Sequence, residues 1–228
     1  TMELLKEFNF PPKFNWSTLK KNRDAYITRL NKLYFQNLEN NKVEVLQGNA
    51  KFIDQNTIIV DQKKYTGKKI LIAVGGRPIT PSIPGATYGI NSNEFFELEE
   101  QPKKIAIVGS GYIAIEFAGL LNGLGSDVTL FIRSKKILKN FDDLVSEQIK
   151  NFLLNSGVKI IENSNIKEIT SNSCLKEIQT DQSAFKFDEV IFAIGRIPNT
   201  DSIDIETTGI KLAKSGIVSV DKLDRKSV

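Results

Sequence analysis

Apolar positions near the start of the chain recur with a helical period. Between Ser17 and Leu38 they return at intervals close to 3.6 residues, and lysines and arginines occupy positions between them. Asn40 and Asn41 then interrupt the pattern. The spacing therefore predicts one long helix from Ser17 to about Leu38. Its apolar positions are Leu19, Tyr26, Ile27, Leu30, Leu33 and Tyr34.

Short apolar runs bounded by turn residues follow this helix. They predict strands over 43–46, 50–53, 57–60 and 70–74, the last of which is apolar throughout and is typical of a buried strand. Glycines end that run, and the stretch over 78–85 then contains three prolines. This composition indicates a linker that crosses between domains.

A regular alternation of strand and helix patterns begins at Lys104. Strands are predicted over 105–108, 128–132 and 157–161, with helices over 113–124 and from Asp142 or Asp143 to Asn155 between them. Such an alternation predicts a parallel sheet with right-handed crossovers. Further strands are predicted over 166–180 (antiparallel, with a turn near Asn172), over 190–194, near Ile210 and over 217–220.

The turn between the strand over 105–108 and the following helix reads G-x-G-x-x-A over 109–114. In this strand–turn–helix setting the string is typical of a dinucleotide site, whereas alone it would be weak. Gly109 permits a tight turn, Gly111 leaves room for a pyrophosphate, and Ala114 allows the helix to pack closely on the sheet. The helix N-terminus offers N–H groups to phosphates. The alternative is a turn that only packs tightly.

The end of the second strand distinguishes the two nicotinamide cofactors. NAD sites usually place an acidic residue there to bind the ribose 2′-hydroxyl, but Ile132 is followed by Arg133 and Ser134. Arg133 and Lys139 are placed to bind a 2′-phosphate, with Ser134 as a neutral donor. The sequence therefore favours NADPH. The lysines over 135–136 either assist or are simply solvated.

Composition excludes several other classes of function. The single cysteine, Cys174, excludes an internal disulfide framework, and the absence of histidine excludes Ser-His or Cys-His pairs and histidine metal sites. The net charge of +4 is too small and too dispersed to indicate nucleic-acid binding. No apolar run approaches the roughly 20 residues of a membrane span, and residues 1–6 do not resemble a signal peptide.

Several segments, in order, resemble the flavin-dependent disulfide reductases of the glutathione reductase type. They are 23–31, 70–78, 84–85, 109–119, 132–133 with 141–142, and 193–200. The resemblance covers essentially the whole chain and implies an α/β fold. It implies a Rossmann-like NAD(P)-binding domain over 81–198, with a parallel sheet, helices and a small antiparallel β-meander. Parts of a second, FAD-binding Rossmann-like domain are implied over 1–80 and 199–228.

The same resemblance implies roles on the nicotinamide side. Ser110, Ile113 and Glu116 would line the nicotinamide pocket, and Gly195 and Arg196 would face the NADPH and the flavin. Tyr112 resembles the family's gate, a ring that covers the flavin until the nicotinamide displaces it. The alternative for Tyr112 is an aromatic packing residue.

On the flavin side, the resemblance implies that Asn49, Ala50 and Gly75 contact FAD. Tyr34 matches a tyrosine of the glutathione site, although on the sequence alone it fits plain helix core. The family's Cys-x4-Cys pair, its first G-x-G-x-x-G and its C-terminal dimerisation domain have no counterpart in this sequence. We therefore expect the central part of a larger enzyme, inactive by itself.

The implied function is the NADPH-binding part of a reductase that passes electrons from NADPH through FAD to a disulfide, with glutathione disulfide favoured as substrate. The complete protein is expected to be a homodimer. We expect it in the cytoplasm, or in an organelle if a presequence has been lost. Two alternatives stay open: a related NADPH-dependent reductase acting on thioredoxin or another small disulfide, and a non-catalytic NADP-binding module. Lipoamide dehydrogenase is disfavoured because the acidic residue of NAD sites is missing.

Overall fold

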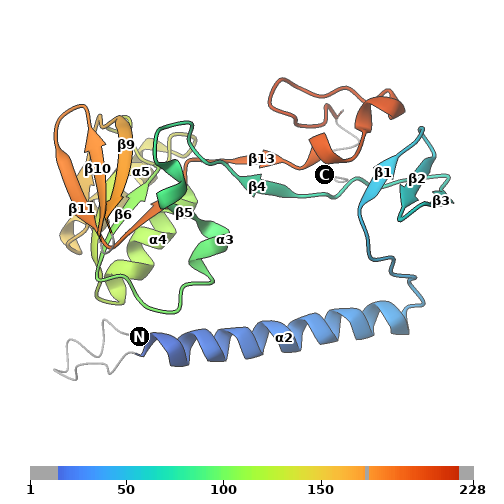
Figure 1. Cartoon of the computed structure of the whole chain (residues 1–228), viewed down its shortest axis with the longest axis horizontal. Coiled ribbons are helices and arrows are strands. Elements are labelled where there is room, and N and C mark those ends of the chain that lie inside the picture. Colours follow the sequence, from blue (N-terminus) through green and yellow to red (C-terminus); the bar gives the residue numbers. More distant parts are fainter. Residues whose placement is uncertain (1–14, 173–174, 221–228) are drawn as a thin grey trace. The chain divides into compact units, whose positions relative to one another are not determined.

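The computed structural model describes residues 15–172 and 175–220, and it divides the chain into two compact units (Figure 1). The sheet unit comprises residues up to Asp24 together with Pro78–Gly195. The second unit comprises Ala25–Arg77 and the residues from Arg196 onward. Cys174 and the first six residues, on which the sequence supported predictions, lie outside the described residues.

A five-stranded sheet forms the centre of the sheet unit, and every neighbouring pair of its strands is parallel. The strand order is β5 (Ile90–Asn91), β12 (Glu189–Phe192), β6 (Lys104–Val108), β7 (Asp127–Phe131) and β8 (Lys159–Ile161). Helices α4 (Tyr112–Gly123) and α5 (Asp143–Asn155) follow β6 and β7 in the chain. The predicted alternation of strand and helix is therefore confirmed, with bounds shifted by one or two residues.

The two faces of β6 serve two different parts of the core. Ile105 and Ile107, both fully buried, pack with the buried residues of α4. Ala106, which points to the other face, packs with residues of an antiparallel meander. This alternation is what a strand covered on both faces requires. The meander consists of β9 (Ile166–Asn172), β10 (Leu175–Thr180) and β11 (Ala184–Phe187), and it confirms the prediction of antiparallel strands there.

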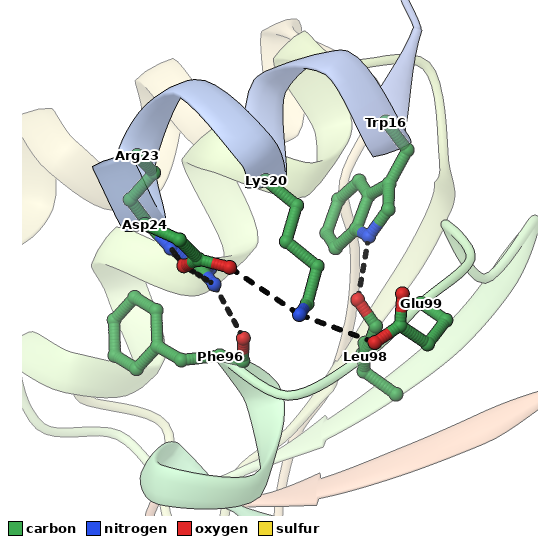
Figure 2. A network of polar contacts seen from close by, with 7 residues as sticks. All are labelled: Trp16, Lys20, Arg23, Asp24, Phe96, Leu98 and Glu99. Atoms are coloured by element: carbon green, nitrogen blue, oxygen red, sulfur yellow. Dashed lines mark hydrogen bonds and ion pairs between the residues drawn. The ribbon is translucent and has the colours of Figure 1, made fainter. Parts of the chain in front are cut away.

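Helix α2 (Trp16–Asn40) confirms the long helix predicted near the start of the chain, although none of its residues is buried. Its first turns belong to the sheet unit, where they contact the segment after α3 (Ser92–Phe95). The Trp16 ring lies edge-on to Phe95, with ring centroids 6.0 Å apart. The polar contacts are Trp16 Nε1 to the Leu98 carbonyl at 2.8 Å, Arg23 to the Phe96 carbonyl at 2.6 Å and Lys20 to Glu99 at 3.1 Å (Figure 2).

The second unit contains less regular structure. Strands β1 (Ala50–Phe52), β2 (Thr57–Val60) and β3 (Lys63–Thr66) form a small antiparallel sheet, and β4 (Gly76–Pro78) pairs with β13 (Arg196–Pro198). Its core is small. Among the described residues its buried hydrophobic cluster consists of Phe52, Ile203 and Ile205, and Ile58, Ile70, Ile72, Ile210 and Val218 pack against it partly buried. Three short 3₁₀ turns complete the described elements: Ala86–Tyr88 in the sheet unit, and Thr200–Ser202 and Ile205–Thr208 in the second unit.

Several predicted strands of the second unit are wrong. Residues 43–46 and 70–74 have no strand structure, and Val43 and Leu71 are 49% and 66% exposed. The physical reason is that no strand of the described residues lies beside either run, so their backbone groups have no ladder to join. The predicted strands near Ile210 and over 217–220 reduce to a single bridge between Leu212 and Val218.

Two negative findings apply to the described residues alone. No helix within 15–172 and 175–220 is both long enough and apolar enough to cross a bilayer. The same ranges hold no cluster of three or more His, Cys, Asp or Glu side chains arranged to hold a metal ion.

Candidate functional site

The turn after β6 requires glycine at its first position. Gly109 has a φ of +141°, and a Cβ atom there would lie 2.2 Å from the Ala193 carbonyl oxygen. No side chain fits at that distance, because the obstructing atom belongs to the backbone of the neighbouring segment. The Gly109 N–H also donates to the Phe131 carbonyl at 3.0 Å. The turn is therefore fixed between the carboxyl ends of β6, β7 and β12.

Gly111 has a different environment. It precedes α4 as the N-cap residue with an extended backbone (φ −83°, ψ 175°), and a Cβ atom there would meet nothing within 4 Å. The fold itself therefore does not require glycine at this position. No side chain caps α4, so the first N–H groups of the helix receive no acceptor from a cap residue. Open space, helix N–H groups and the positive end of the helix dipole together suit a phosphate group.

A basic loop over 133–139 follows β7 and carries two cations that have no partner among the described residues. Ile132 is buried, and the exposed Arg133 comes next. Within the described part of the chain, neither Arg133 nor Lys139 makes an ion pair or a side-chain hydrogen bond. Ser134 is half-buried, and its hydroxyl donates to the Lys136 carbonyl at 3.2 Å. The loop therefore offers two free positive charges to an anion.

Lys136 differs from these two cations because the fold uses its charge. Its Nζ forms an ion pair with Asp143 at the start of α5 and donates to the Phe141 carbonyl at 3.3 Å. This contact with Lys136 lowers the pKa of the Asp143 carboxyl below its ordinary value. The sequence left two interpretations for Lys136, an assisting cation or a solvated one, and the structure shows its charge paired with Asp143.

The basic loop is attached to the glycine turn. The Leu138 N–H donates to the Ser110 carbonyl at 2.7 Å, and Ile137 and Leu138 are buried. Lys139, the next residue, is consequently held near the start of α4. Sequence reasoning missed the role of Ile137 and Leu138, although an apolar pair inside a basic run is a recognisable signal of such an anchor.

The remaining predicted residues of the sheet unit surround the same edge. Gly195 follows β12 with a φ of +137°, and its carbonyl accepts from the Ile79 N–H at 3.0 Å. Ile113 is half-buried and Glu116 is exposed one turn later on α4. Tyr112 is 57% exposed, so its ring is not a core packing residue among the described residues. The structure thus brings the predicted NADPH residues of this unit to one edge of the sheet.

The other predicted residues belong to the second unit. Asn49 and Ala50 are exposed at the start of β1, and Gly75 has a φ of +65°. The guanidinium of Arg196 donates to the Gly76 carbonyl. Tyr34 is 62% exposed on α2, so the alternative of helix core is wrong among the described residues. Next to Ala50 lies a hollow of about 100 Å³ whose other lining residues are Lys51, Phe52, Ile58, Ile70, Leu71, Ile72, Val74 and Ile203.

A parallel sheet with a glycine turn leading into a helix, and with the candidate residues at its carboxyl edge, defines a dinucleotide-binding fold. The sequence model of a family described as pyridine nucleotide-disulphide oxidoreductase matches residues 4–228. The match covers nearly the whole chain. The chain belongs to this family.

Within this family, the chain is similar to individual glutathione reductases. The glutathione reductase of Schizosaccharomyces pombe is 40% identical over 243 residues, which cover 100% of this chain and 52% of that protein. The glutathione reductase of Nostoc sp. is 42% identical over 206 residues, with 89% of this chain and 45% of that protein covered. The chain therefore spans about half the length of the curated relatives it matches.

A solved structure gives the same class. The HOCl-induced flavoprotein disulfide reductase RclA from Escherichia coli superposes with a TM-score of 0.86 at 28% sequence identity. The superposition covers 92% of this chain and 49% of that one. The likeness thus extends over both units of the chain.

Proposed function

We propose that this chain is the NADPH-binding part of a flavoprotein disulfide reductase whose complete form reduces glutathione disulfide. The names of the similar proteins support the reaction class and the substrate. The observation that carries the cofactor assignment is the loop after β7. No acidic residue stands at the end of that strand. The loop instead carries Arg133 and Lys139, which have no partner among the described residues, and it is attached to the glycine turn.

The residues present fit an NADP-type dinucleotide. The empty space beside Gly111 accepts a pyrophosphate against the backbone, and the α4 N–H groups donate to it. Arg133 binds a 2′-phosphate bidentately, and Lys139 adds a point charge. When bound, NADPH would supply a hydride to FAD, and the two electrons would then reduce a disulfide to two thiols. Gly109 holds the turn in place while these groups bind.

The further assignments belong to the same proposal. Ser110, Ile113 and Glu116 line the nicotinamide pocket, and Tyr112 is the gate that covers the flavin until the nicotinamide displaces it. Gly195 and Arg196 face the NADPH and the flavin, and Ser134 is a neutral donor to the 2′-phosphate. Asn49, Ala50 and Gly75 contact FAD, and Tyr34 contacts glutathione disulfide. The NADPH domain occupies 81–198, and FAD-domain segments occupy 1–80 and 199–228. The complete protein is a cytoplasmic homodimer.

A binding comparison tests the cofactor assignment. The double variant Arg133→Ala with Lys139→Ala should lose about 1.5–3 kcal/mol of NADPH binding per charged contact and leave NADH binding nearly unchanged. Nicotinamide fluorescence on titration measures both affinities. The matched control is Lys103→Ala, which removes an exposed charge just before β6, at the opposite end of that strand. Equal weakening of NADPH and NADH in the double variant would contradict the 2′-phosphate assignment.

A related candidate function is reduction of a different disulfide. RclA from Escherichia coli superposes over both units, and its name specifies no glutathione. Steady-state assays of the complete protein with glutathione disulfide and with oxidised thioredoxin separate the two. The proposal predicts the higher kcat/KM for glutathione disulfide.

A further inference from the structure

The start of α5 holds the basic loop through a buried hydroxyl. Ser146 is 4% exposed, and its Oγ donates to the Ile137 carbonyl at 2.6 Å. Ile137 itself is fully buried. A buried carbonyl without a partner is costly, so this hydrogen bond fixes the position of Ile137 relative to α5.

The residue after Ile137 has an unusual backbone. Leu138 has a φ of +48°, a left-handed conformation that a leucine adopts only where its surroundings impose it. Two contacts impose it here: burial of the side chain and the N–H donated to the Ser110 carbonyl. This geometry turns the chain so that Lys139 emerges beside the glycine turn.

An ion pair between Lys136 and Asp143 makes a second connection between the loop and α5. Asp143 is 91% exposed in its side chain, so this pair is weaker than the Ser146 hydrogen bond. A third connection is the hydrogen bond from Lys150 Nζ of α5 to the Lys135 carbonyl at 3.0 Å. The glycine turn also has an anchor outside the loop, because the Gly109 N–H donates to the Phe131 carbonyl. Loosening the loop should therefore displace Lys139 more than the pyrophosphate position.

We propose that Ser146, assisted by the Lys136–Asp143 pair, is a positioning residue that sets selectivity for a 2′-phosphorylated dinucleotide. The proposal rests on the proposed function and deepens it. Ser146 touches no cofactor atom in this account. It acts by holding the part of the loop that carries Lys139 in place before the ligand arrives, so that binding does not have to order it.

Calorimetric titration of the full chain with 2′,5′-ADP and with 5′-AMP tests this role. Ser146→Ala should weaken 2′,5′-ADP binding by about fivefold to tenfold, the effect of one lost hydrogen bond, and should change 5′-AMP binding by less than about twofold. Ser146→Thr, which keeps the hydroxyl, should restore most of the selectivity. A general structural defect would instead weaken the binding of both ligands alike, and that result would overturn the proposal.

A pair of acidic variants keeps the test valid if Ser146→Ala does not fold. Asp143 and Glu147 are exposed acids of α5, but only Asp143 contacts the loop within the described residues. If the acids act only through charge, Asp143→Ala and Glu147→Ala should both strengthen binding of the anionic 2′,5′-ADP. If the loop is held in place as proposed, Asp143→Ala should bind 2′,5′-ADP about twofold to threefold more weakly than Glu147→Ala. Equal or tighter binding by Asp143→Ala would overturn the proposal.

Titration of the wild-type chain distinguishes failure of the proposed function from failure of the positioning role. Without any preference for 2′,5′-ADP over 5′-AMP, the proposed function itself fails. A wild-type preference that persists unchanged in both Ser146→Ala and Asp143→Ala leaves the proposed function intact and removes only the positioning role.

Discussion

The apolar runs over 105–108 and 70–74 look alike in the sequence, yet they take different structures in the two units. The first becomes β6, which has β12 on one side and β7 on the other, and its Ile107 is fully buried. The second has no neighbouring strand among the described residues, and Leu71 is 66% exposed. An apolar run thus becomes a strand only where the same chain supplies strands beside it.

Helix α2 shows the same contrast within one element. Its first turns contact the segment after α3 through Trp16, Lys20 and Arg23 (Figure 2). In its second-unit part, Tyr26 and Tyr34 are 53% and 62% exposed. Helical periodicity alone predicted both parts equally well, because it reports which residues share a face and not what covers that face.

Substitutions at the two glycines of the turn should differ most in their effects on stability and on NADPH binding. Gly109→Val should destabilise the sheet unit by about 4 kcal/mol, because its φ is positive and the Ala193 carbonyl blocks a Cβ atom. Gly111→Val should change stability by less than about 1 kcal/mol but abolish NADPH binding, because its side chain fills the proposed pyrophosphate space. Urea unfolding and nicotinamide fluorescence measure the two effects. Undiminished binding in folded Gly111→Val would remove this turn from the site.

Truncation of the two similar apolar runs sharpens the comparison between the units. Ile107→Ala should cost about 3 kcal/mol of unfolding free energy, because it opens a cavity in a closed core. Leu71→Ala should cost less than about 0.5 kcal/mol, because the side chain is largely exposed. Urea denaturation followed by circular dichroism compares them. Similar losses would mean that the Leu71 side chain is packed in solution.

Trp16, the single tryptophan of the chain, tests the docking of the first turns of α2. Trp16→Ala should cost about 2 kcal/mol, since a partly buried ring and its hydrogen bond to Leu98 are lost. Amide hydrogen exchange should rise over 16–24. Trp16→Phe keeps the ring contact and should cost about half as much. The matched control, Tyr26→Ala, removes an exposed ring and should leave exchange over 16–24 unchanged.

The smallest expected effect concerns acid stability in the second unit. The Arg77 guanidinium, 2.6 Å from Asp201, lowers the pKa of that carboxyl below its ordinary 3.8. Its contribution to stability is therefore present above the unfolded-state pKa and is lost as the pH falls through the lower folded-state pKa. Asp201→Asn should be slightly less stable than wild type at neutral pH and should converge with it in acid. Urea unfolding across that pH range checks this, and a constant difference would contradict it.

The sequence predicted the sheet unit well because its signals are local. Alternating strands and helices, the cap at Asp142 and the glycine turn are each read from a few adjacent residues. The sequence also placed Arg133 and Lys139 after the second strand. It did not reveal that Leu138 attaches the loop to Ser110 or that Ser146 holds Ile137, because those contacts join a loop to other elements and leave no periodic pattern in the sequence. Strand β3 was missed because Lys63 and Lys64 conceal its alternation.

Selective binding of a 2′-phosphate at the carboxyl edge of the sheet is the central claim. The most direct measurement is a low-salt calorimetric titration of this chain with 2′,5′-ADP and, in parallel, with 5′-AMP, with the fold confirmed by circular dichroism. We expect 2′,5′-ADP to bind tighter than 5′-AMP by at least about tenfold, the value of one charged contact. Equal or absent binding by the folded chain would contradict it and would mean that Arg133 and Lys139 do not form the site.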